Sequence, residues 1–107
     1  GPITGVIVAR REVVDANPDA VDAFLKDYAA SVEWVNGNTA EAAQLISEYG
    51  IVEAAPVAEK ALPYCNIVCI TGSEMKEKLS GYLQVLSDAE PASVGGALPG
   101  EDFYYGA

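Results

Sequence analysis

The stretch from Asn17 to Gly37, NPDAVDAFLKDYAASVEWVNG, predicts the longest helix of the chain. Asn17 is a good N-cap residue, and Pro18 suits the first helical position because its fixed φ angle is already helical. Apolar residues then recur at three- and four-residue steps, which places them on one face of a helix. They are Val21, Phe24, Leu25, Tyr28, Val32 and Val35. Asn36-Gly37 provides a stop, with glycine available for a left-handed C-cap, so we expect a helix over residues 18–36.

Shorter helices are expected around this one. Residues 39–49 and 73–86 also repeat their apolar side chains at helical spacing, and residues 56–62 begin at a proline and end before another. Glu12–Ala16 is long enough for a single helical turn.

Two segments favour an extended conformation because they are rich in β-branched residues. They are residues 4–10 within TGVIVARR and residues 65–71, CNIVCIT. A lone strand leaves its backbone groups unpaired, so these segments must pair with each other or with chain outside this sequence. We therefore expect an α/β fold: a mostly helical fragment of one lobe of a larger protein, with one to three short strands.

Composition limits the classes of partner. The chain has 107 residues, half of them apolar, which fits one globular domain. Its 6 basic and 16 acidic residues give a net charge of −10. Nucleic acids and anionic membranes bind clustered Lys and Arg, so neither is expected as a direct partner. No apolar run reaches the 18 or so residues of a membrane helix.

The cysteines and the absence of histidine argue against catalysis and metal binding. Four residues along a strand separate Cys65 from Cys69 by about 13 Å, whereas a disulfide needs Cα atoms within about 7 Å. We expect two buried free thiols. With no histidine in the chain, neither a zinc site nor an ordinary general base is available. We expect no enzyme activity, no metal and no cofactor.

The order of three motifs resembles one transport family. The motifs are Arg11-Glu12-Val13, then Asn17-Pro18-Asp19-Ala20-Val21, then Asn38-Thr39-Ala40-Glu41-Ala42-Ala43. Their spacing, together with the closing VGGALPGEDFYY, is similar to the C-terminal segment of ABC-transporter solute-binding proteins. The closest group contains the nitrate, sulfonate, taurine and pyrimidine-precursor binders, and the resemblance covers essentially all 107 residues.

This resemblance implies a two-lobed α/β protein of the periplasmic-binding-protein type, with a solute held in the cleft between the lobes. Residues 4–10 then lie near the hinge, the helices build one lobe, and residues 93–105 form a C-terminal strap. The implied partners are a small-molecule solute and the ABC permease subunits. The implied location is extracytoplasmic, with membrane anchoring through a part of the parent protein outside this chain.

Four residues are candidates for ligand contact. Thr4 and Gly5 offer a hydroxyl and a backbone amide near the expected hinge, and Gly5 permits close approach of a ligand. Arg10 could bind an anionic group of the ligand through its guanidinium, and the Asn66 side chain could donate a hydrogen bond to the ligand. Each also has a structural interpretation: a strand lead-in for Thr4 and Gly5, pairing with surface acids for Arg10, and completion of a turn for Asn66.

Two other functions remain open at this stage. The chain could be a stand-alone acidic helical module that binds a protein through Phe103-Tyr104-Tyr105. It could also belong to an enzyme of the pyrimidine-precursor type, whose histidine this chain lacks. In isolation, exposed helix faces and unpaired strand edges lead us to expect a homo-oligomer.

Overall fold

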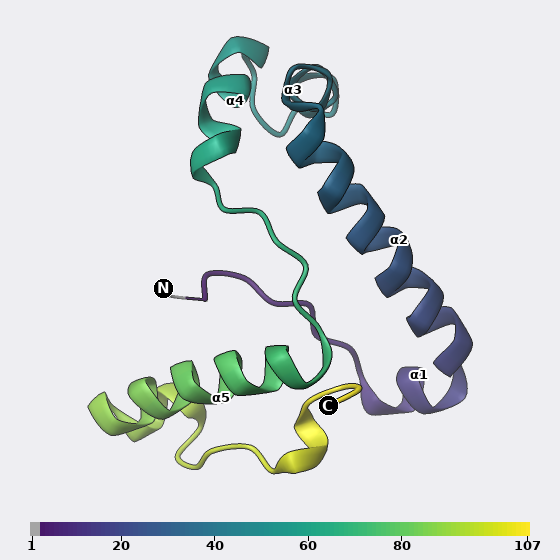
Figure 1. Ribbon diagram of the computed structural model, residues 1–107. Helices are drawn as coiled ribbons and strands as arrows, with labels where there is room; N and C mark the ends of the chain where they lie inside the picture. The colour runs from purple at the N-terminus through teal and green to yellow at the C-terminus, as the bar shows by residue number, and fades with distance from the viewer. Residues whose placement is uncertain (1–2) are drawn as a thin grey trace. The chain divides into compact units, whose positions relative to one another are not determined.

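The computed structural model describes residues 3–107, and its regular structure is entirely helical (Figure 1). The elements are α1 (Arg11–Ala16), α2 (Pro18–Gly37), α3 (Thr39–Glu48), α4 (Ala55–Ala61), η1 (Leu62–Tyr64), α5 (Gly72–Ala89), η2 (Pro91–Val94) and η3 (Glu101–Phe103). The chain divides into two compact units. Unit 1 contains residues 3–8 and 70–107, and unit 2 contains residues 9–69.

The expected α/β fold is wrong for this chain. Helices account for 68% of the described residues, and no strand occurs among them. Residues 4–10 and 65–71, where strands were expected, have no regular structure. The β-branched residues there favour an extended backbone, but a strand also requires a neighbour to complete its hydrogen-bond ladder. Neither segment has such a neighbour in the described chain.

An asparagine lies at each end of α2, at positions 17 and 38. The expected N-cap hydrogen bond from the Asn17 side chain to α2 is absent. The Asn17 side chain donates to the carbonyl of Val13 at 3.0 Å and makes no N-cap hydrogen bond to α2. Asn38 likewise donates to the carbonyl of Trp34 at 2.9 Å. Both side chains therefore satisfy carbonyls at the end of the preceding helix. Gly37 is the last helical residue and does not have a positive φ angle, so it is not a left-handed C-cap.

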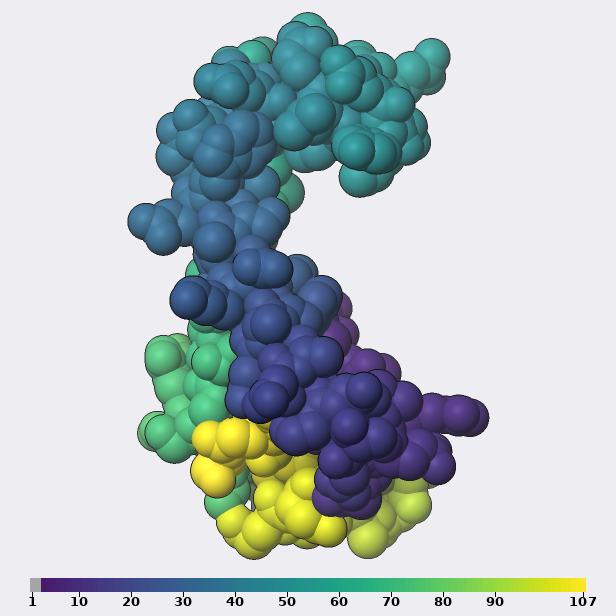
Figure 2. All heavy atoms as spheres, turned by 90° about the vertical axis from the view of Figure 1, so that its right-hand side faces the viewer, coloured from purple at the N-terminus to yellow at the C-terminus, as the bar shows by residue number. Residues whose placement is uncertain are grey.

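The core of unit 2 lies between α3 and α4 and is built mainly from alanine. Ala42 and Ala43 of α3 are 2% and 1% exposed, and they pack with Ala58 and Leu62. Small side chains let the two helix backbones approach closely. Figure 2 shows the atoms of α3 and the loop that follows it gathered in one cluster at the top of the view. The Ser47 hydroxyl fixes the intervening loop by donating to the carbonyl of Glu53 at 2.7 Å.

The apolar face of α2 is only partly covered. Val21, Leu25, Val32 and Val35 are half-buried. Phe24 and Tyr28 are exposed, and their ring centroids lie 5.9 Å apart. The helical spacing of these residues therefore leaves an aromatic pair on the surface of unit 2.

Candidate functional site

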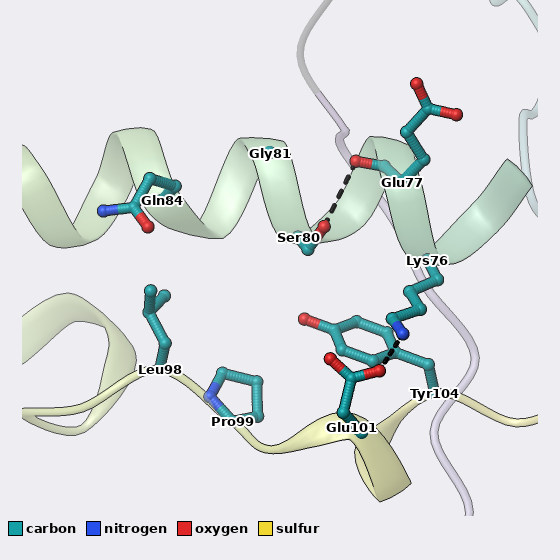
Figure 3. A pocket seen from close by; sticks show the side chains of 9 residues that line it. All are labelled: Lys76, Glu77, Ser80, Gly81, Gln84, Leu98, Pro99, Glu101 and Tyr104. Carbon is teal, nitrogen blue, oxygen red and sulfur yellow. Dashed lines mark hydrogen bonds and ion pairs between the residues drawn. The ribbon is translucent and has the colours of Figure 1, made fainter. Parts of the chain in front are cut away.

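A pocket of about 360 Å³ lies within unit 1, between α5 and the C-terminal strap (residues 93–105). This volume is near the lower end of the range for small-molecule sites, which runs from about 300 to 1,000 Å³. Its lining residues are Lys76, Glu77, Ser80, Gly81, Gln84, Leu98, Pro99, Glu101 and Tyr104 (Figure 3).

The α5 wall of the pocket follows from helical spacing. Lys76, Ser80 and Gln84 are four residues apart, so their side chains lie one above another on one face. The helix begins after Thr71, whose backbone is extended, and carries Glu74 in its first turn, where a negative charge favours the helix dipole. Lys78 lies 3.9 Å from Glu74, an additional pair one turn apart.

The strap wall depends on a reversal of the chain after η2. Gly95 and Gly96 have φ angles of 78° and 93°, which favour glycine because a β-carbon is strained there. The Ser93 hydroxyl contacts the carbonyls of Leu86 and Glu90, at 3.1 and 2.7 Å, and so joins the start of the turn to the end of α5. The strap then runs back along α5 (Figure 1).

Tyr104 anchors the strap. It is 8% exposed, the only buried residue among the described residues of unit 1, and the ring of Phe103 meets it edge-on at 5.2 Å between centroids. Phe103 itself is 53% exposed. The three closing aromatics therefore differ in burial: Tyr104 is buried, Phe103 lies edge-on against it and is exposed, and Tyr105 is half-buried.

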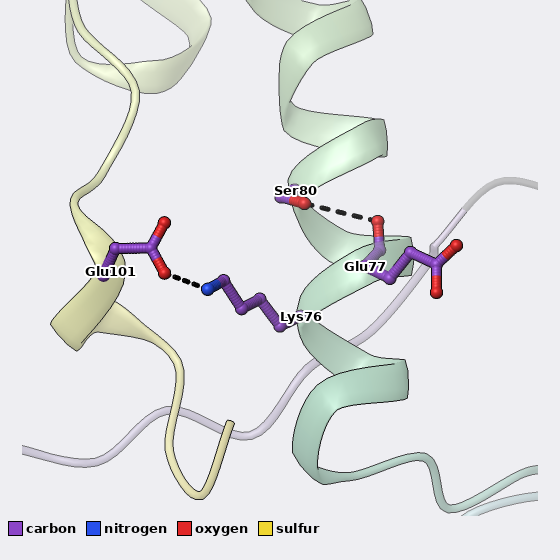
Figure 4. A network of polar contacts seen from close by, with 4 residues as sticks. All are labelled: Lys76, Glu77, Ser80 and Glu101. Carbon is purple, nitrogen blue, oxygen red and sulfur yellow. Dashed lines mark hydrogen bonds and ion pairs between the residues drawn. The ribbon is translucent and has the colours of Figure 1, made fainter.

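An ion pair crosses the pocket mouth. The Lys76 ammonium group of α5 contacts the Glu101 carboxylate of the strap (Figure 4). The Glu101 side chain is 85% exposed, so solvent weakens the attraction and the pair contributes at most about 1 kcal/mol. The pair also lowers the net charge beside the pocket, because the ammonium group and the carboxylate neutralise each other.

Several polar atoms of the pocket can accept hydrogen bonds. The Gln84 amide nitrogen donates to Asp88 at 2.8 Å, which fixes the orientation of the amide. Figure 3 shows its oxygen on the pocket side. The Ser80 hydroxyl donates to the carbonyl of Glu77 at 3.3 Å and keeps its lone pairs. The Tyr104 hydroxyl points into the space between Ser80 and Pro99 (Figure 3).

Gly81 is an unusual residue for the middle of a helix. Glycine there costs about 0.5–1 kcal/mol of helix stability relative to alanine. A close neighbour would explain it, but no heavy atom lies within 4 Å of the position that a β-carbon would occupy. Gly81 is exposed and lies one turn after Glu77, so the open space beside it faces solvent, although its backbone contributes to the pocket lining.

The four residues predicted to contact a ligand fall in both units. Thr4 and Gly5 belong to unit 1, while Arg10 and Asn66 belong to unit 2, and all four are exposed. Nothing lies within 4 Å of a β-carbon built on Gly5, so the described chain would leave room for a side chain there. The ligand contacts of these residues stay a prediction.

Two of these residues have local structural roles. Arg10 precedes α1, and its carbonyl accepts hydrogen bonds from the amides of Val13 and Val14, both at 3.1 Å. Asn66 has a positive φ angle of 52°, and its side chain donates to the carbonyl of Tyr64 at 3.3 Å. Asn66 thus completes a turn after η1, a conformation that asparagine tolerates better than most residues.

The cysteines are both free thiols in the structure. Cys65 is exposed rather than buried, and its sulfur donates to the carbonyl of Ala61 at 3.3 Å, while Cys69 is half-buried. Over residues 3–107, no group of three or more Cys, Asp or Glu side chains is placed to hold a metal ion. None of the described helices has the length and apolar character needed to cross a bilayer.

The sequence prediction missed the pocket residues. The four-residue spacing of Lys76, Ser80 and Gln84 was a visible signal. What the sequence could not show is that the strap returns along this face of α5. Comparison with protein-family models, curated proteins and solved structures finds no significant match to this chain.

Proposed function

We propose that this chain is the C-terminal part of the solute-binding component of an ABC importer. The order of the three motifs that begin at Arg11, Asn17 and Asn38, followed by the closing strap, supports this proposal. In this role the chain performs no chemistry. It helps to hold a small solute and to present it to a membrane permease.

The structural observation that carries the proposal is the exposure of residues 6–8. Val6, Ile7 and Val8 are 58%, 54% and 80% exposed, although they are consecutive apolar residues. Consecutive apolar residues are typical of a segment that is covered on both sides, and a stable single-chain protein rarely leaves such a segment in solvent. The remaining part of a longer binding protein would provide the cover.

Ligand contacts in this proposal come from Thr4, Gly5, Arg10 and Asn66, together with residues outside the chain. A hydroxyl, a backbone amide and a guanidinium group suit a polar or anionic solute. The Asn66 side chain already donates to Tyr64, so its contribution would require that contact to be exchanged. Thr4 and Arg10 are therefore the more useful residues to mutate.

The test begins with the reading frame that encodes the chain. We expect it to continue upstream and to encode a secretion signal. The full protein should then be purified, denatured and searched by mass spectrometry for a released small molecule. Binding of that molecule, measured by calorimetry, should weaken on Arg10→Ala and Thr4→Val, whereas Lys60→Ala, which removes a charge from the exposed side of α4, should leave it unchanged.

Absence of any small molecule, together with a failure of the full protein to stimulate ATP hydrolysis by its neighbouring permease, would contradict the importer proposal. Equal binding by all three variants would instead exclude Thr4 and Arg10 from the site.

A second candidate is a stand-alone acidic module that binds a protein partner. The observation in its favour is that each unit is formed from helices without any strand in the described chain, as an independent helical protein would be. Phe103, 53% exposed at the surface of unit 1, is the anchor residue in this case. This candidate predicts a monomer with a cooperative thermal transition, which differential scanning calorimetry would detect.

A further inference from the structure

We propose that the surface at the end of α3 binds a cationic peptide segment of a partner protein, in which Lys or Arg residues flank an apolar side chain. The surface consists of Leu45, Glu48, Tyr49, Ile51 and Glu53, and we call it the Tyr49 surface. It lies within unit 2 and contains none of the residues assigned to the importer's solute. The proposal therefore does not depend on that function.

A rigid turn holds the apolar side chains of this surface. The amide of Gly50 donates to the carbonyl of Ser47 at 3.0 Å. The amide of Ile51 donates to the carbonyl of Ile46, also at 3.0 Å. These two bonds, with a φ angle of 73° at Gly50, form a Schellman motif. The Ser47 hydroxyl also bonds to the carbonyl of Glu53, so a partner meets a turn that is already ordered and binding loses little conformational entropy.

The turn leaves its largest apolar side chains in solvent. In a Schellman motif the residue after the glycine commonly packs back against the end of the helix. Ile51 has this position but is 73% exposed, and Tyr49, just before the glycine, is 80% exposed. Leu45, one helical turn before Tyr49, is exposed as well. Val52 packs against the core instead, so Tyr49 and Ile51 contribute little to the packing of unit 2 and are available to a partner.

Acidic residues surround these apolar side chains. Glu48 directly precedes Tyr49, and the bond between Ser47 and the backbone of Glu53 brings Glu53 to the same turn. Both glutamates are exposed. The stretch from residue 27 to residue 59 contains six acidic residues and no Lys or Arg. A basic partner is therefore attracted to this surface, whereas an acidic one is repelled.

The combination of apolar and acidic groups selects the occupant. Tyrosine is a common anchor residue of protein interfaces, because its ring provides contact area and its hydroxyl a hydrogen bond. Lys and Arg side chains on either side of an apolar residue can pair with Glu48 and Glu53 while that residue covers Tyr49 and Ile51. A second copy of the chain fits less well, because two chains of net charge −10 repel each other.

The experiment is a titration of the ¹⁵N-labelled 107-residue chain with the blocked peptide Lys-Lys-Leu-Trp-Lys-Lys, followed by amide chemical shifts. We expect saturable shifts centred on residues 45–53, with a dissociation constant on the order of 0.1–1 mM for so small a surface. Glu-Glu-Leu-Trp-Glu-Glu reverses the charge and Lys-Lys-Ser-Ser-Lys-Lys removes the apolar residues. Both control peptides should bind at least about fivefold more weakly.

A matched pair of tyrosine variants tests the anchor. Tyr49→Ser should weaken binding at least about fivefold, as expected for the central aromatic residue of an interface. Tyr64→Ser is the control, because Tyr64 is 84% exposed in the same unit but has no acidic residue between positions 61 and 67. It should leave binding unchanged.

A matched pair of charge variants tests the carboxylates. Glu48→Gln combined with Glu53→Gln removes two negative charges with little change in shape and should weaken binding several-fold. Glu12→Gln combined with Glu33→Gln removes the same charge from exposed positions of α1 and α2 and should have a smaller effect. This comparison separates a local contact from attraction to the overall charge of the chain.

The proposal is overturned if Lys-Lys-Leu-Trp-Lys-Lys gives no saturable shifts, if either control peptide binds as well, or if Tyr49→Ser binds as tightly as Tyr64→Ser. Tighter binding of Val-Ile-Val-Ala-Arg-Arg, the sequence of residues 6–11, would assign the surface to a second copy and would also overturn it. Far-UV circular dichroism shows whether Tyr49→Ser is folded. If it is not folded, the double variant at Glu48 and Glu53 decides: weakened binding supports the surface, and unchanged binding overturns it.

Discussion

The side-chain amide of Asn36, at the end of α2, donates a hydrogen bond of 2.9 Å to the backbone carbonyl of Ile67. These residues are 31 positions apart in the sequence, so the bond joins distant segments of unit 2. The bond ties the end of the long helix to the irregular segment after η1. Ile67 also packs against the core formed by α3 and α4.

Replacing Asn36 by alanine should therefore destabilise unit 2. An intramolecular hydrogen bond contributes about 0.5–1.5 kcal/mol, and Asn36→Ala should lower the free energy of unfolding by an amount in that range. Urea denaturation measures it. Gln44→Ala, which removes an exposed amide from α3, is the control and should change stability by less than about 0.5 kcal/mol. Equal effects of the two variants would show that the Asn36 contact contributes nothing.

The core of unit 2 should be sensitive to loss of Leu62, the largest of its four buried side chains. Leu62 is 7% exposed and packs with three alanines. We expect Leu62→Ala to cost about 2–5 kcal/mol, because it removes buried surface and leaves a cavity. Val57→Ala, at a residue that is 59% exposed in the adjoining helix, should be nearly neutral. A loss below about 1 kcal/mol for Leu62→Ala would mean that this cluster does not hold the unit together.

The helices were predictable because their signals are local. Pro18 and the apolar spacing from Val21 to Val35 are enough to place α2, whose observed range, Pro18–Gly37, is one residue longer than expected. The N-cap of α2 was harder to predict, because the side chain of an asparagine between two helices can bond to the end of one helix or to the start of the other. Asn17 bonds to the end of α1, and the sequence does not show which choice is lower in free energy.

The strands and the pocket depended on contacts that local patterns do not contain. Residues 4–10 have the composition of a strand, yet strand formation depends on a neighbour. The core was also underestimated, since Ala42, Ala43 and Ala58 are too small to stand out in an apolar pattern. For the pocket, the spacing of Lys76, Ser80 and Gln84 was visible in the sequence, but the return of Leu98 and Pro99 along the same helix was not.

The closing aromatics should differ in their contributions to unit 1. Tyr104 is 8% exposed and Phe103 is 53% exposed. Tyr104→Ala should cost about 2 kcal/mol or more and release the strap, whereas Phe103→Ala should cost less, because a half-exposed ring buries less area. Limited digestion with a glutamate-specific protease, which cuts after Glu101 once the strap is released, compares the two. Faster cleavage of the Phe103 variant would reverse the assigned roles.

Self-association of the chain should increase with salt. Val8 is 80% exposed within the apolar run 6–8, which favours association, while the net charge of −10 opposes it. Salt shortens the Debye length from about 30 Å at 0.01 M to about 8 Å at 0.15 M and so weakens the repulsion more than the apolar contact. Sedimentation velocity should show a larger mean mass at 0.15 M salt. Val8→Asp should prevent this increase, whereas Ser31→Asp, which adds the same charge at an exposed position of α2, should only reduce it. A monomer at both salt concentrations, or identical behaviour of the two variants, would show that residues 6–8 do not drive association.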